Sequence, residues 1–157
     1  MSDFDAPNIS TRQTDALARV GKRALAQFLD GLVVGVPLFF VTAAFGFSLT
    51  DESLSDSDLT WLTVLWVGAN LIYNIAAIAV YGFTVGKRIV GIKVVNRADG
   101  GRVSWTYAAV RALIPTAVQL VPAIGPGLAL AVYLRAVFHP LRQGIHDAAA
   151  GTIVVRR

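Results

Sequence analysis

The sequence predicts an all-α membrane protein with two full transmembrane helices, a broken or re-entrant third helical region and a small cytoplasmic β element. Two apolar runs, Ala24 to Phe47 and Leu59 to Tyr81, are each longer than the roughly 20 residues that a helix needs to cross a bilayer. Hydrophobic residues make up 55% of the chain and charged residues only 15%, unlike a typical soluble domain. Between the runs, Ser48 to Thr60 holds acidic residues and no Lys or Arg.

The distribution of basic residues predicts the orientation of the two spans. Lys and Arg near the ends of spans are retained on the cytoplasmic side. They cluster before the first run and after the second, so the acidic loop is expected outside and both termini in the cytoplasm. The basic residues in these two flanks are Arg12, Arg19, Lys22, Arg23, Lys87, Arg88, Lys93, Arg97, Arg102 and Arg111. A cleavable signal peptide is excluded, because the first run begins after a polar stretch, is too long and is followed by a second span.

Two short segments predict the β element. Ile89 to Val95 is rich in β-branched residues, Asn96 to Gly101 is turn-forming, and Val103 to Trp105 is expected to return as a second strand. The C-terminal segment Gly151 to Val155 has the same character and is able to pair with this hairpin. Residues 1–15 lack apolar periodicity and are expected to be a mobile cytoplasmic tail, which leaves 16–157 as the membrane domain.

The third apolar region, Ala112 to Phe138, contains three prolines and two glycines that interrupt a regular helix. A break near Val121 to Gly127 leaves two halves that each reach about half of a bilayer. A kinked single span would put Arg135 and Arg142 outside, against the positive-inside rule. We therefore expect a re-entrant pair of short helices, with the single span as the alternative.

Composition also limits the partners and cofactors. The net charge of +4 is explained by a basic face toward anionic lipid headgroups, so we expect a lipid bilayer as partner and no nucleic acid. The chain has no cysteine, which excludes disulfides and thiolate metal sites. No cofactor and no metal site is predicted.

Three segments together resemble the RDD family of small prokaryotic membrane proteins, which is named for one Arg and two Asp. These segments are Arg23 to Asp30, Gly82 to Val95, and Gly144 to Asp147 followed by Ala150 to Thr152. The resemblance covers about residues 18–155 and places the protein in a prokaryotic plasma (inner) membrane. It implies a set of structural signature residues, namely Arg23, Asp30, Gly86, Lys87, Arg111, Asp147 and Gly151.

The resemblance also implies two possible functions. Some members of the family are linked to cation/proton exchange, and related domains occur in larger membrane assemblies. We therefore expect cation/proton transport by an oligomer, since so few short helices enclose little volume. The alternative is a non-transporting accessory or assembly subunit of a larger membrane complex.

Asp30 is the leading candidate for an ion or proton site, because an unpaired carboxylate about 9 to 10 Å inside a helix costs several kcal/mol when ionised. It either pairs with Arg111 or Arg23 to lock helices together, or forms a proton or cation site. Asn70 and Asn74 share one helix face, with Asn74 at the depth of Asp30. Gln119 is able to join them from the third region. Such oxygen ligands favour a hard monovalent cation.

Other motifs predict no enzyme. Gly82 to Lys87 is one residue short of a phosphate-binding loop and lacks the Ser or Thr after the lysine. His146 and Asp147, with His139 nearby, have no matched nucleophile and no third metal ligand. We expect Asp147 to cap a helix or to pair with Lys87 or Arg88.

Overall fold

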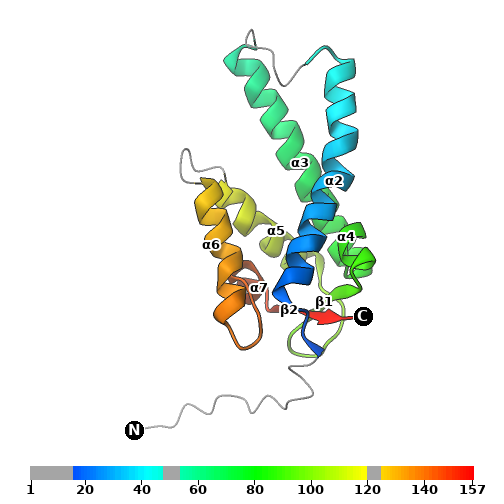
Figure 1. The fold of residues 1–157 in the computed structure, drawn as a ribbon, viewed down its shortest axis with the longest axis vertical. Helices are drawn as coiled ribbons and strands as arrows, with labels where there is room; N and C mark the ends of the chain where they lie inside the picture. The colour runs from blue at the N-terminus through cyan, green and yellow to red at the C-terminus, as the bar shows by residue number, and fades with distance from the viewer. Residues whose placement is uncertain (1–15, 48–53, 120–124) are drawn as a thin grey trace.

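The computed structural model describes residues 16–47, 54–119 and 125–157. Two long helices dominate it, α2 (Val20–Ala44) and α3 (Asp56–Tyr81), and Figure 1 shows them rising side by side from the rest of the chain. Their most apolar segments have mean hydropathies of 1.9 and 1.7, so both are long and apolar enough to cross a membrane. The predicted pair of membrane-type helices is confirmed, and the predicted N-terminal tail lies outside the described residues.

Polar residues at its ends fix the bounds of α3. Ser55 and Asp58 form a reciprocal capping box, so the helix starts three residues before the apolar run. Gly82 ends the helix with a φ of 77°, a left-handed conformation that glycine adopts without strain. The chain then turns back into the short helix α4 (Val85–Ile89).

The β element is a two-stranded antiparallel sheet. Strand β1 (Ile92–Asn96) pairs with β2 (Thr152–Arg156), with Val94 opposite Val154. The predicted pairing of the C-terminal segment is therefore confirmed, but the predicted return strand at Val103 to Trp105 is wrong. The other edge of β1 is already bonded to Gly82, whose carbonyl accepts from Val94 N at 2.7 Å.

The third apolar region forms two helices, α5 (Trp105–Gln119) and α6 (Gly125–Phe138), which pack against each other. Pro115 lies inside α5 and does not end it. The predicted break, Val121 to Gly127, lies partly on residues 120–124, which are outside the described part of the chain, whereas Gly125 to Gly127 already belong to α6. Re-entrance of this helix pair into the bilayer stays a prediction. The short helix α7 (Ile145–Ala149) follows and leads into β2.

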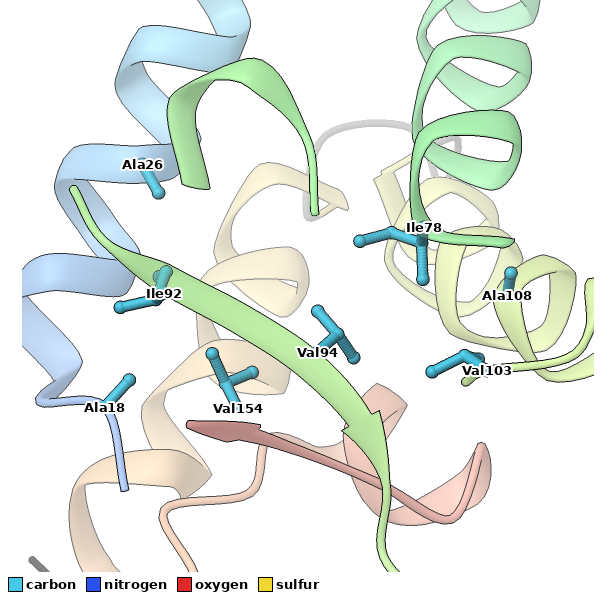
Figure 2. Close-up of a cluster of buried hydrophobic side chains, with 8 residues drawn as sticks. All are labelled: Ala18, Ala26, Ile78, Ile92, Val94, Val103, Ala108 and Val154. Carbon is cyan, nitrogen blue, oxygen red and sulfur yellow. The ribbon is translucent and has the colours of Figure 1, made fainter. Parts of the chain in front are cut away.

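The buried core lies below the membrane-type helices, where their ends meet the sheet and α5 (Figure 2). Its members are Ala18, Ala26, Ile78, Ile92, Val94, Val103, Ala108 and Val154. Higher up, α2 and α3 expose large apolar side chains, such as Phe40 (66%) and Trp61 (72%). Contiguous apolar surface of this kind belongs in a membrane or against another subunit.

Candidate functional site

A buried carboxylate on α2 joins three segments of the chain. Asp30 is 2% exposed and accepts four hydrogen bonds. Its Oδ1 accepts from the Tyr73 hydroxyl and from Gly86 N, both at 2.8 Å. Its Oδ2 accepts from Thr84 Oγ1 at 2.5 Å and from Lys87 Nζ at 3.3 Å. We call these five residues the Asp30 cluster, and it ties α2 to α3 and α4.

The sequence from Gly82 to Lys87 explains how these donors reach α2. The left-handed Gly82 reverses the chain, and the Thr84 side chain caps α4 by accepting from Lys87 N at 3.4 Å. A Cβ added at Gly86 would lie only 2.9 Å from Asp30 Oδ1, so only glycine allows this approach. The glycine, threonine and glycine-lysine pattern therefore builds a cradle for one carboxylate.

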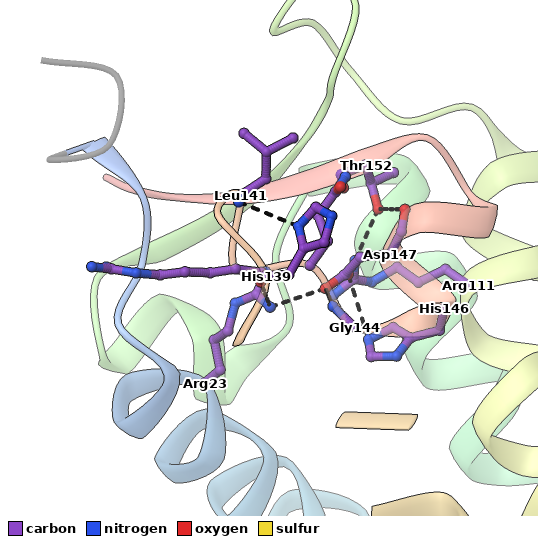
Figure 3. A network of polar contacts seen from close by, with 10 residues as sticks. Arg23, Arg111, His139, Leu141, Gly144, His146, Asp147 and Thr152 are labelled. Atoms are coloured by element: carbon purple, nitrogen blue, oxygen red, sulfur yellow. Dashed lines mark hydrogen bonds and ion pairs between the residues drawn. The ribbon is translucent and has the colours of Figure 1, made fainter. Parts of the chain in front are cut away.

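The second buried carboxylate, Asp147, binds two arginines (Figure 3). Its Oδ2 accepts from Arg23 Nη1 at 2.9 Å and from Gly144 N at 3.1 Å, while its Oδ1 accepts from Arg111 Nη1. Arg111 Nη1 also donates to Thr152 Oγ1 at 3.0 Å, at the start of β2. We call these five residues the Asp147 cluster, and it joins α2, α5, α7 and β2.

The predicted ion pairs are interchanged in the structure. Arg23 and Arg111 contact Asp147 rather than Asp30, and Lys87 contacts Asp30 rather than Asp147. Arg23 lies seven residues before Asp30, about 10 Å along α2, so the two side chains stand at different levels of the helix. The alternative expectation for Asp147 is confirmed, because its bond to Gly144 N caps α7.

A cavity of about 640 Å³ lies between α2, α3, α5 and α6. Arg23, Lys87 and Arg111 line it, whereas no Asp or Glu is among the described residues of its wall. Asp30 and Asp147 therefore contact these cations from behind. The pKa of Lys87 is lowered to about 8, mainly by burial; Asp30 opposes the shift, and the charges of Arg111 and Arg23 add to it.

Three of the four predicted ion-site residues, Asp30, Asn70 and Asn74, do not bond to one another through their side chains. Asn70 and Asn74 line the cavity, but their amides donate to backbone carbonyls one turn earlier, Trp66 O and Asn70 O, each at 3.0 Å. Neither bonds to Asp30 in the described part of the chain. Gln119 closes α5, and its side chain lies outside the described residues.

Sequence reasoning missed two members of the Asp30 cluster, Tyr73 and Thr84. Thr84 belongs to the motif of the second segment, which gave a signal for it. Tyr73 carries no such signal, since an aromatic side chain inside an apolar helix indicates packing, and the partner of its hydroxyl lies on another helix. Of the signature residues, Gly151 has a φ of 57° and forms the turn from α7 to β2.

Metal ligands are sparse over residues 16–47, 54–119 and 125–157. No three His, Asp or Glu side chains come together there in a way that suits a metal ion. His146 packs on the Tyr133 ring with centroids 4.7 Å apart. Burial, followed by the charges of Arg111 and Arg23, lowers the pKa of His146 far below its ordinary value, so the ring is neutral.

The fold and these clusters define a small helical protein of membrane type whose two buried carboxylates hold its polar end together. The model of the RDD family matches residues 17–151, and the chain belongs to that family. It is 32% identical over 130 residues to the uncharacterized protein YckC of Bacillus subtilis strain 168, covering 82% of this chain and 78% of that protein.

A second relative is the uncharacterized protein YxaI of the same strain, 33% identical over 98 residues. This match covers 52% of the chain and 64% of YxaI, so the chain spans less than two thirds of that relative. No solved structure matches the chain. The names of these two relatives assign no activity to them.

Proposed function

We propose that this protein is a multi-pass protein of the prokaryotic plasma membrane, with both termini cytoplasmic, that exchanges a monovalent cation for a proton as an oligomer. The supporting observation is the position of the Lys87 ammonium. It lies 3.3 Å from Asp30 Oδ2 and 3.1 Å from Thr84 Oγ1, between two oxygens that suit a hard cation. Lys87 also lines the cavity, which gives its proton a way out.

The exchange follows from competition for one carboxylate. When Lys87 releases its proton to the cavity, the neutral amine no longer balances Asp30, and a monovalent cation takes its place beside Oδ2. When Lys87 regains a proton, the ammonium displaces the cation. The site carries no net charge in either state, because the bound cation replaces the positive charge that Lys87 loses with its proton, so one cation exchanges for one proton.

Two features make this exchange feasible near neutral pH: the carboxylate is held in place, and the pKa of Lys87 is lowered. Tyr73, Thr84 and Gly86 donate to Asp30 at 2.5 to 2.8 Å and hold the carboxylate in place while its fourth partner changes. The pKa of Lys87 is lowered to about 8, mainly by burial, so proton release does not require strongly alkaline conditions. The helices of one chain enclose too little volume for a complete ion pathway. In this proposal the rest of the pathway runs between protomers of the oligomer.

The test is Na⁺, K⁺ and Li⁺ flux in proteoliposomes that contain a pH indicator. When a cation gradient is imposed across the vesicle membrane, we expect the wild type to move protons in the direction opposite to the cation. Lys87→Met should lose this coupled movement of protons. Asn96→Asp, a charge change at the last residue of β1, is the control and keeps the exchange. An inactive wild type, or Lys87→Met with full exchange, would contradict the proposal.

A second candidate is a non-transporting accessory or assembly subunit. Its support is the exposed surface of the long helices, since only 11% of the residues in the most apolar part of each are buried within the chain. Helices of other subunits are able to cover this surface in place of lipid. Copurification of the tagged protein with other membrane subunits, together with no flux in vesicles, would favour this candidate.

A further inference from the structure

We propose that the cavity between α2, α3, α5 and α6 binds one anionic phospholipid, with the phosphate beside Arg23 and Arg111 and an acyl chain along the apolar wall. This inference does not depend on cation exchange. It commits to a lipid of the surrounding bilayer, recognised by its negative headgroup.

The first argument is the charge of the cavity wall. Three cations, Arg23, Lys87 and Arg111, are balanced by only two carboxylates, Asp30 and Asp147. His146 does not change this balance, because its ring is neutral. One positive charge is left over in a largely buried site, and a buried charge without a partner is strongly unfavourable. An anion in the cavity would balance it.

The second argument comes from hydrogen-bond donors that have no acceptor. Arg23 Nε and Nη2 are buried and bond to nothing among the described residues. Arg111 uses Nη1 for both of its partners, Asp147 and Thr152, which leaves its other nitrogens available. A phosphate provides several strong acceptors at once, and arginine forks match its geometry.

The third argument is the separation of polar and apolar residues along the helices. On α2, Arg23 lines the cavity near the sheet and Phe28 lines it farther from the sheet. On α5, Arg111 and Pro115 follow the same order. On α3, Trp66 lies deepest of the residues that line the cavity. The cations thus lie at the sheet end, and the side chains above them are mostly apolar. Asn70, Asn74 and Thr116 also line this part, but each donates to a carbonyl of its own helix. This is the order of headgroup and acyl chain in one leaflet.

Size and location agree with this occupant. A volume of about 640 Å³ is that of a small-molecule site, which commonly measures about 300–1,000 Å³, so the cavity takes the phosphate and one acyl chain while the second chain stays in the bilayer. Basic pockets between membrane helices commonly hold anionic headgroups. Free phosphate would leave the apolar wall uncovered, and a lipid without net charge would leave the extra cation unbalanced.

Gln27 allows a variant that tests the charge without removing any cluster residue. It lines the cavity one helical turn after Arg23 and is exposed, with no hydrogen-bond partner among the described residues. Gln27→Glu changes no size and places a negative charge beside the cations. It should therefore replace the lipid's charge. Asn96→Asp makes the same charge change outside the cavity and is the matched control.

The experiment measures lipid binding to the full chain in detergent. Trp61 and Trp105, which are 72% and 58% exposed, are replaced by Phe so that Trp66 alone reports on the cavity. Brominated phosphatidylglycerol, brominated phosphatidylcholine and inorganic phosphate are titrated separately. Bromine on the acyl chain quenches Trp66 when that chain enters the cavity, and thermal stability is followed in parallel.

We expect phosphatidylglycerol to quench Trp66 with saturation at one lipid per chain and to bind about fivefold more tightly than phosphatidylcholine, as one added ionic contact implies. Gln27→Glu should remove this preference and Asn96→Asp should keep it. Equal affinity for both lipids in the wild type, or an unchanged preference in Gln27→Glu, would overturn the proposal. Stabilisation by inorganic phosphate equal to that by phosphatidylglycerol would also overturn it, because the ligand would then be a free anion.

Discussion

Replacing Asp147 by Asn removes the charge that holds Arg23 and Arg111 at the base of the membrane helices. The Asp147 side chain is 0% exposed, and the two arginines are 14% and 11% exposed. Removing one partner of a buried ion pair costs about 3–5 kcal/mol, because the remaining charge stays buried without compensation. Here two cations lose their partner at once. The amide oxygen of Asn is still able to accept from Gly144 N, so the loss reflects charge rather than the helix cap.

The measurement is the free energy of unfolding in mixed micelles, from a titration with a denaturing detergent. Asp56→Asn is the control, since Asp56 is exposed in the first turn of α3 and its loss should cost less than about 1 kcal/mol. Adding Arg111→Met to Asp147→Asn should restore part of the stability by removing one unpaired cation. A loss in Asp147→Asn no larger than the control's would refute the reasoning.

Three further predictions concern the Asp30 cluster. Gly86→Ala should prevent normal folding, seen as lost monodisperse yield, because the added Cβ would collide with the Ala26 carbonyl oxygen and with Asp30; Gly31→Ala should fold normally, since nothing lies within 4 Å there. Tyr73→Phe should lower the free energy of unfolding by about 1–3 kcal/mol, because a buried carboxylate loses a donor. The free energy of unfolding should rise from pH 8 toward 10.5 in the wild type, because Lys87 keeps its proton in the unfolded chain at pH values where folded Lys87 has released it. Lys87→Met should show a smaller rise.

The helices and the sheet were predictable because their signals are local. Apolar runs longer than a bilayer needs predict α2 and α3, and β-branched segments predict β1 and β2. The return strand at Val103 was wrong for a nonlocal reason. Gly82 already bonds to the second edge of β1, and no sequence pattern near Val103 reports this.

The two ion-pair clusters required knowledge of the turn after α3. Depth along α2 correctly indicated that Asp30 needs a partner, but three cations near the membrane interface were all possible candidates. The chain reversal at Gly82 brings Lys87 beside Asp30 on α2, and both arginines pair with Asp147 instead. Spacing along one helix is readable from sequence, whereas the choice between equivalent charges on separate elements depends on the tertiary fold.

The structure changes which variant decides whether the protein exchanges cations. Loss of flux in Asp30→Asn would not separate a transport site from a structural one, because four donors from two other helices and the α3–α4 turn meet at this carboxylate. Lys87→Arg separates them. Arginine retains the positive charge beside Asp30 but does not release its proton, so folding should be kept while exchange is lost. Thermal stability in detergent tests whether folding is kept, and proteoliposome flux tests whether exchange is lost. A stable Lys87→Arg variant that still exchanges cations for protons would show that the proton is carried elsewhere.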